Sequence, residues 1–200
     1  MKYTITDERP LSWSAISSFE YDPKQWHDKY VLGKKQKESA EMLFGKKVGE
    51  RLASDPKYLP FVPRLKKFEH EFKVSFDGIP LIGFADSFCT LTSKKLYEYK
   101  TGVKAWDQKR VDMHGQIDMY LLMHFIKEKI RPEEVACKLV WLPTKREEGG
   151  DFKVHISFIE PIEETFKIFK TKRTMSDILR FGERIKSTYK AMQEYVENHK

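Results

Sequence analysis

The central part of the chain alternates between apolar and polar positions with a period of two residues. Between residues 67 and 76, four of the five even positions carry phenylalanine or valine, which is the pattern of a strand with one buried face. Asp77-Gly78 follows and is a strong signal for a hairpin turn. Residues 79–91 then predict the returning strand, and residues 96–102 predict a third strand after a second turn. We therefore expect three antiparallel strands here.

A different period precedes these strands. In residues 39–54 the apolar side chains recur at three- and four-residue spacing, which predicts an amphipathic helix. Its expected core positions are Met42, Leu43, Val48 and Leu52.

Residues 105–130 predict the longest helix in the first two thirds of the chain, because their apolar side chains recur with the same helical spacing. Gly115 lies inside it and costs about 1 kcal/mol relative to alanine. Near the N-terminus, Ser12 or Ser14 can cap a short helix, and Pro23 breaks or restarts that helix.

Two further strands and a helical tail complete the prediction. Residues 134–143 read as a buried strand and residues 152–159 as another. The fold class is therefore α/β, with a mixed central sheet flanked by helices. We expect a single domain over residues 1–200, with N-terminal helices at about 12–54, the sheet and its helix at about 67–160, and C-terminal helices at about 161–198.

Composition narrows the class of protein. Hydrophobic residues make up 40% of the 200 residues and aromatic residues 14%, which indicates a globular chain. No run of about 18 apolar residues exists, so we expect no membrane span, and the N-terminus has no apolar signal segment. The two cysteines form no CxxC pattern, so the reducing cytoplasm is the expected compartment. A net charge of +7 favours a polyanionic partner such as nucleic acid.

Three charged residues on the predicted second and third strands suggest a catalytic site. Glu98 and Lys100 share one face of a strand because side chains alternate, and a symmetric turn would place Asp86 close to residue 100 or 101. Two adjacent carboxylates repel each other unless a cation lies between them. Mg²⁺ or Mn²⁺ fits oxygen ligands, and the backbone carbonyl of Tyr99 is a natural further ligand.

Such a cation would serve phosphodiester hydrolysis, with Lys100 orienting or deprotonating a water and offsetting phosphate charge. Two simpler interpretations stay open for the same residues. Asp86 alone fits a strand-end carboxylate, and Glu98 with Lys100 fits a cross-strand ion pair worth at most about 1 kcal/mol when exposed.

The segments GFADSF (residues 83–88) and EYK (residues 98–100) resemble the D…ExK signature of the PD-(D/E)XK nucleases. Three more segments resemble elements of the RecB-like exonuclease branch, in the same order. They are LSWSAISSFEYDPKQW at residues 11–26, FGKKVGERL at residues 44–52, and GQIDMY at residues 115–120, which matches a Gln-x-x-x-Tyr helix. The resemblance covers about residues 11–120.

This resemblance implies a restriction-endonuclease-like core and a Mg²⁺- or Mn²⁺-dependent deoxyribonuclease, with exonuclease as the favoured form, in DNA recombination, repair or phage DNA processing. It implies that Gln116 points at the lysine or at a phosphate. Tyr120 would contact the DNA backbone or the site, although packing in the core is an equal alternative. The expected partner is single- or double-stranded DNA, and a homo-oligomer or a recombination partner protein is left open.

Two positions depart from the branch. Its helix motif carries histidine where this chain has Gly49, and glycine has no side chain to bind a metal. The adjacent Glu50 would then be the substitute metal ligand, although one residue along a helix is a rotation of about 100°. Asp22 stands where iron–sulfur members have cysteine, and the tail has no cysteine, so no iron–sulfur cluster is expected.

Two other classes of function remain as alternatives. The chain could be a catalytically inactive nucleic-acid-binding or adaptor protein on a nuclease fold, with Gly49 as a first sign of lost activity. It could also be a scaffold whose strand charges form salt bridges. Lys46 and Lys47 could border a phosphate track in the nuclease. Trp13, Trp26 and Trp106 could stack unpaired bases, with burial as the competing expectation for at least two of them.

Overall fold

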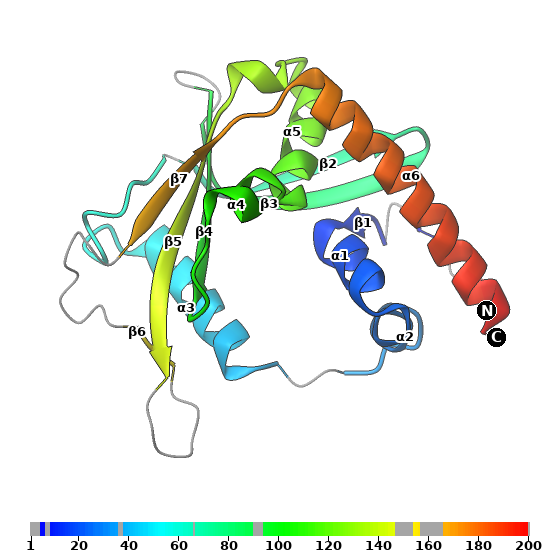
Figure 1. Ribbon diagram of the computed structural model, residues 1–200, viewed down its shortest axis with the longest axis horizontal. Helices are drawn as coiled ribbons and strands as arrows, with labels where there is room; N and C mark the ends of the chain where they lie inside the picture. Colours follow the sequence, from blue (N-terminus) through cyan, green and yellow to red (C-terminus); the bar gives the residue numbers. More distant parts are fainter. Residues whose placement is uncertain are drawn as a thin grey trace.

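The computed structural model describes residues 5–6, 9–35, 38–65, 67–89, 94–146, 154–156 and 166–199. Figure 1 shows helices on both sides of a long twisted sheet. In chain order the elements are β1 (Leu11–Ser12), α1 (Trp13–Tyr21), α2 (Pro23–Trp26), the π-helical turn η1 (His27–Val31), α3 (Ala40–Ser54), β2 (Lys67–Phe76), β3 (Ile79–Cys89), β4 (Lys95–Gly102), α4 (Gln108–Asp112), α5 (Gly115–Glu128), the 3-10 turn η2 (Pro132–Glu134), β5 (Ala136–Arg146), β6 (Val154–Ile156), β7 (Lys167–Thr171) and α6 (Met175–Asn198).

The sheet is mixed, and β3 and β5 are its best-paired strands. One edge of β3 pairs with antiparallel β2, while the other edge pairs first with parallel β1 and then with antiparallel β4. Strand β5 pairs in parallel with β4 and, along its opposite edge, in antiparallel fashion with β7 and β6. The predicted α/β class with a mixed central sheet flanked by helices is confirmed.

The β2–β3 hairpin forms where the sequence predicts it. Phe76 pairs with Ile79, and the two residues between them adopt the left-handed region, with φ of 47° at Asp77 and 80° at Gly78. Positive φ at both central residues is the geometry of a type I′ turn, whose twist matches that of the flanking strands.

Helices cover the two faces of the sheet unequally. The larger core joins α1, α5 and α6 to β2 and β3, and Trp26, Phe72 and Met119 are among its fully buried side chains. On the other face α3 contributes Val48 and Leu52 to a smaller cluster that includes Val140 of β5. These two packed regions fix α5 and α3 on opposite sides of β4.

The predicted helix over residues 105–130 is in fact two helices, α4 and α5, separated at Met113 and His114. A Cβ built on Gly115 would overlap the ring of Trp13, so α5 begins where α1 packs directly on its backbone. The cost of glycine in a helix interior is avoided because Gly115 is the first residue of α5.

Two other predictions are corrected. Met42 and Leu43 are 58% and 44% exposed, because the buried face of α3 runs through Val48 and Leu52 instead. The tail, predicted as helices over residues 161–198, contains the strand β7 before α6. β7 adds to the edge of β5, and its alternation of Lys167, Ile168, Phe169 and Lys170 gives little signal of its own.

The N-terminal segment forms as predicted. The side chain of Ser12 accepts a hydrogen bond from the backbone N–H of Ala15 at the start of α1, and Pro23 opens the second helix, α2. None of the helices in the described part of the chain combines the length and apolarity that a membrane crossing requires.

Candidate active site

The site lies where β3 and β4 separate. Their backbone pairing ends at Ser87 and Tyr97, and the carboxylate of Asp86 takes over by accepting a hydrogen bond of 2.8 Å from the backbone N–H of Tyr99. Asp86 therefore lies beside Glu98 and Tyr99, and not beside residue 100 or 101 as predicted. The turn over residues 90–93 lies outside the described residues.

Glu98 and Lys100 are in direct contact on the face of β4 that α5 covers. The Nζ atom of Lys100 donates a hydrogen bond of 2.6 Å to Oε1 of Glu98. The Glu98 side chain is 1% exposed and that of Lys100 is 25% exposed. An exposed cross-strand ion pair, the simpler interpretation, does not fit a carboxylate this deeply buried.

Burial, followed by the neighbouring charge of Asp86, raises the pKa of Glu98 to about 8. Burial alone would lower the pKa of Lys100, but the charges of Glu98 and Asp86 outweigh it and hold that pKa above its ordinary value. Near neutral pH the carboxyl group of Glu98 therefore favours its protonated form, while Lys100 stays charged.

Gln116 of α5 holds the other side of Lys100. Its Oε1 atom accepts a 2.8 Å hydrogen bond from Nζ of Lys100, and its Nε2 atom donates one of 2.6 Å to the hydroxyl of Tyr120. That hydroxyl donates in turn to the backbone carbonyl of Phe84, on the stretch of β3 that β4 has left. The chain of contacts fixes the amide orientation of Gln116.

Both interpretations of Tyr120 have support in these contacts. Its ring is 4% exposed and belongs to the larger core, while its hydroxyl reaches the site through Gln116. A Cβ on Gly83 would lie 2.9 Å from Cε1 of Tyr120, so the glycine of the GFAD segment is what lets the ring approach β3.

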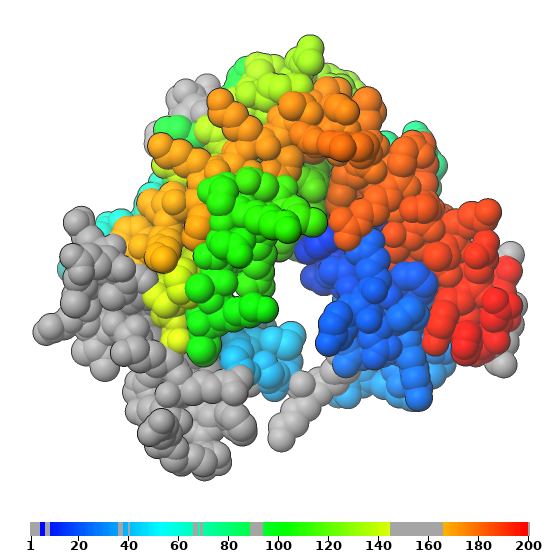
Figure 2. All heavy atoms as spheres, in the orientation of Figure 1, coloured from blue at the N-terminus to red at the C-terminus, as the bar shows by residue number. Residues whose placement is uncertain are grey.

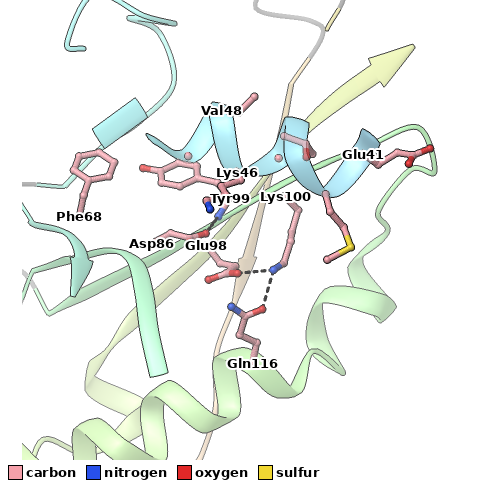
Figure 3. Close-up of a pocket in the computed structure, with 13 residues that line it drawn as sticks. Glu41, Lys46, Val48, Phe68, Asp86, Glu98, Tyr99, Lys100 and Gln116 are labelled. Carbon is pink, nitrogen blue, oxygen red and sulfur yellow. Dashed lines mark hydrogen bonds and ion pairs between the residues drawn. The ribbon is translucent and has the colours of Figure 1, made fainter. Parts of the chain in front are cut away.

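A pocket of about 460 Å³ opens at the point where the strands separate. Figure 3 shows Glu98, Lys100 and Gln116 pointing toward one another, with Asp86 beside them. The pocket is lined by Glu41, Met42, Gly45, Lys46, Val48, Gly49, Phe68, Asp86, Glu98, Tyr99, Lys100, Thr101 and Gln116.

Helix α3 forms the side of the pocket opposite Gln116. The glycines of α3 have no side chains, so they leave space in the pocket on that side. A Cβ on Gly49 would meet nothing within 4 Å, whereas one on Gly45 would lie 3.0 Å from Oγ1 of Thr101. Glu50 is exposed and does not line the pocket, so its predicted metal ligation has no support in this geometry. Glu41 lines the pocket, but Figure 3 shows its carboxylate directed away from Asp86 and Glu98.

The donor set suits one hard cation. The Oε2 atom of Glu98 is buried and has no hydrogen-bond donor among the described residues, and the carboxylate of Asp86 and the backbone of Tyr99 lie beside it. A divalent ion would satisfy that oxygen and remove the repulsion between the carboxylates. Within the described ranges, no group of three or more His, Cys, Asp or Glu side chains could hold a metal ion.

Sequence reasoning missed the contributions of Gly45 and Thr101 to the pocket. For Gly45 the sequence contained a signal. The helical spacing of residues 41, 45, 48 and 49 places these four positions on one face of α3. Of the other predicted residues, Lys46 lines the pocket and Lys47 does not. Trp26 and Trp106 are 0% and 9% exposed, so neither is open for stacking on a base.

Comparison with solved structures places this fold among exonucleases. An alkaline exonuclease from Laribacter hongkongensis superposes with a TM-score of 0.55 at 12% identity, covering 95% of this chain and 92% of that one. The same enzyme in complex with dAMP gives a TM-score of 0.53 at 10% identity, over 95% and 92% of the two chains. A phage-related exonuclease from Haemophilus somnus 129PT gives 0.54 at 12% identity, over 94% and 83%.

At these identities the likeness establishes the fold. The chain has the mixed α/β fold of alkaline and phage-type exonucleases. No family model matches the sequence, and no curated protein matches it significantly.

Proposed function

We propose that this protein is a Mg²⁺- or Mn²⁺-dependent deoxyribonuclease. We favour an exonuclease that acts in DNA recombination, repair or phage DNA processing. The observation that carries the proposal is the convergence of Asp86, Glu98 and Lys100 in one pocket, with an oxygen of Glu98 that lacks a donor in the described chain. The exonuclease fold of its structural neighbours, one of them solved with dAMP, supports DNA as the substrate.

The carboxylates of Asp86 and Glu98 and the backbone carbonyl of Tyr99 would hold the cation. When bound, such a cation polarises phosphate oxygens and lowers the pKa of water. The burial of Glu98 favours this arrangement, because a charge removed from water gains most from a close counter-charge.

Lys100 would orient the attacking water and offset the negative charge that develops on the phosphate. Its ammonium group has three donors, of which Glu98 and Gln116 take two. The third is available to a water or a phosphate oxygen, since the side chain is 25% exposed toward the pocket. Because Glu98 and Gln116 both accept hydrogen bonds from its ammonium group, Lys100 acts as a hydrogen-bond donor in this scheme.

Gln116 and Tyr120 would act as positioning residues. Because the Gln116 amide is held at both ends, Lys100 has one favoured direction, and precise orientation of a catalytic group accounts for large factors in rate. Lys46, exposed at the rim, would contribute to attraction of the DNA backbone.

A second candidate is a DNA-binding protein that has lost hydrolysis. The specific observation behind it is Gly49, which presents no ligand to a pocket that otherwise contains two carboxylates beside Lys100. DNA binding that EDTA leaves unchanged, without cleavage in Mn²⁺, would establish this alternative.

The test uses end-labelled linear DNA and circular DNA, each single- and double-stranded, incubated with Mg²⁺, Mn²⁺ or EDTA. We expect metal-dependent release of nucleotides from linear substrates. Lys100→Ala should abolish cleavage while the thermal melt shows a folded protein, and Lys104→Ala, an exposed lysine on the loop after β4, should cleave like the parent. Equal cleavage by Lys100→Ala and the parent would refute the mechanism.

A further inference from the structure

One exposed arginine beside the pocket is held in place without a carboxylate. The guanidinium carbon of Arg110 lies 3.8 Å from the centroid of the Trp106 ring, within the range of a cation–π contact. Trp106 is 9% exposed and packs with Val111, Leu139 and Trp141. The indole therefore forms a fixed platform, and Arg110 lies on its solvent side.

Other arginines of this face are neutralised. Arg173 pairs with Asp118, Arg180 with Asp177, and Arg184 with Glu20. Arg110 forms no ion pair within the part of the chain that the structure describes, and only its backbone N–H is taken up, by the side chain of Asp107 at the start of α4. Its positive charge is therefore available to an anion.

The charge of Arg110 acts on the active site. Burial, followed by the charges of Lys100 and Arg110, lowers the pKa of His114 to about 3. Helix α5 starts directly after His114, and no side chain of the described residues caps its N-terminus. The positive end of the α5 dipole therefore lies in the region around His114. Three sources of positive potential thus meet beside the pocket.

The outline of the molecule agrees with this location. Figure 2 shows an opening between α1, in blue, the β4–α4 segment, in green, and α3, in cyan. Strand β4 and helix α3 also line the catalytic pocket, and α4 carries Arg110. A nucleic-acid strand that enters the pocket along this side passes α4.

We propose that Arg110 binds a phosphate of the DNA strand next to the phosphate held at Lys100. Arg110 does not line the pocket itself, so its phosphate is a neighbouring one, and it positions the strand rather than taking part in the chemistry. A guanidinium stacked on a ring keeps its fork of donors in one plane, which suits bidentate contact with phosphate oxygens. This inference rests on the proposed nuclease function.

The experiment measures binding of fluorescein-labelled single-stranded and duplex DNA by anisotropy, in EDTA, over a series of salt concentrations. Arg110→Ala should weaken binding about 10-fold at low salt and reduce the slope of log K against log salt by about 1. Arg110→Lys should restore the slope and only part of the affinity. The matched control is Lys109→Ala, the adjacent exposed cation on the same helix, which should stay within about 2-fold of the parent.

Steady-state cleavage in Mg²⁺ separates positioning from chemistry. Arg110→Ala should raise KM about 10-fold with kcat close to the parent value. Equal binding, salt slope and KM in Arg110→Ala and Lys109→Ala, with a parent that cleaves DNA, would overturn this inference alone. A parent that neither binds nor cleaves DNA would overturn the proposed function and this inference together.

Discussion

The carboxylate of Asp86 accepts a hydrogen bond from the backbone N–H of Tyr99, in place of the backbone acceptor that β3 withdraws as it leaves β4. Asp86 therefore has a structural task and a proposed metal-binding task, and substitutions can separate the two. An asparagine keeps an oxygen for the N–H but has no charge, whereas an alanine keeps neither.

Asp86→Asn and Asp86→Ala should both lose DNA cleavage, but only Asp86→Ala should lose substantial stability. We expect about 1–3 kcal/mol less free energy of unfolding in the alanine variant, because it leaves the Tyr99 N–H without its acceptor. Urea denaturation checks this difference, and Mn²⁺ titration should show weakened binding in both variants. Equal stabilities would mean that the hydrogen bond to Tyr99 contributes little.

Tyr120→Phe tests the chain of contacts from Phe84 to Lys100. Removing the hydroxyl frees the Gln116 amide to rotate and leaves the carbonyl of Phe84 without its donor. We expect kcat to fall about 10-fold through lost positioning and stability to fall by about 1 kcal/mol. Tyr97→Phe, at a buried tyrosine of β4 that does not line the pocket, should leave kcat unchanged. A fall of the same size in both variants would remove the positioning role of Tyr120.

Gly49 offers a gain-of-function test. Because a Cβ at this position meets no atom within 4 Å, Gly49→Ala should raise stability by up to about 1 kcal/mol through helix propensity. Gly49→Glu should add a carboxylate near those of Asp86 and Glu98 and tighten Mn²⁺ binding about 10-fold, as measured by calorimetry. Gly49→Gln is the uncharged control. If the glutamate and glutamine variants bind Mn²⁺ equally, the wall of α3 does not face the cation.

We predict that protonation of His124 lowers the stability of the fold at acidic pH. It is 1% exposed between Phe72 and Phe88, and burial lowers its pKa to about 4 from an ordinary 6.5. The unfolded chain binds the proton more readily, so stability is retained above pH 6.5 and is lost as pH falls from 6.5 through 4.

His124→Phe should remove part of that loss, on the order of 1–3 kcal/mol at pH 4 relative to pH 7. Urea denaturation of parent and variant at several pH values between 4 and 7 measures it. The pKa of His114 is also lowered. The stability of the variant should therefore still depend on pH, because His114 continues to titrate. Parallel pH curves for the two proteins would show that His124 is not the group that titrates.

Local patterns were enough to predict the elements that local chemistry determines. The Asp77-Gly78 turn and the alternation in β2 depend on neighbours in sequence and were confirmed. The helix α3 was confirmed too, although Val48 and Leu52 alone of its four expected core positions are buried. The pairing of Glu98 with Lys100 follows from strand alternation alone, so the order of residues is enough to place the two charges on one face.

What the sequence could not supply depends on contacts between distant segments. The ring of Trp13, about a hundred residues earlier in the chain, leaves room for no side chain at Gly115. The position of Asp86 depends on where β3 leaves β4, which no local pattern encodes. Likewise, β7 is a strand because the edge of β5 is available to it, and Glu50 points outward because α3 docks through Val48 and Leu52.

The placement of α3 and α5 on two separately packed regions has a thermodynamic consequence. The pocket lies between these two helices. A ligand that contacts both Gly49 of α3 and Gln116 of α5 therefore links the smaller hydrophobic cluster to the larger core. Regions with few buried contacts open more readily than the rest of a protein. We therefore expect occupation of the pocket to slow amide hydrogen exchange most in α3. Part of the binding free energy would stabilise the packing of that helix against the sheet.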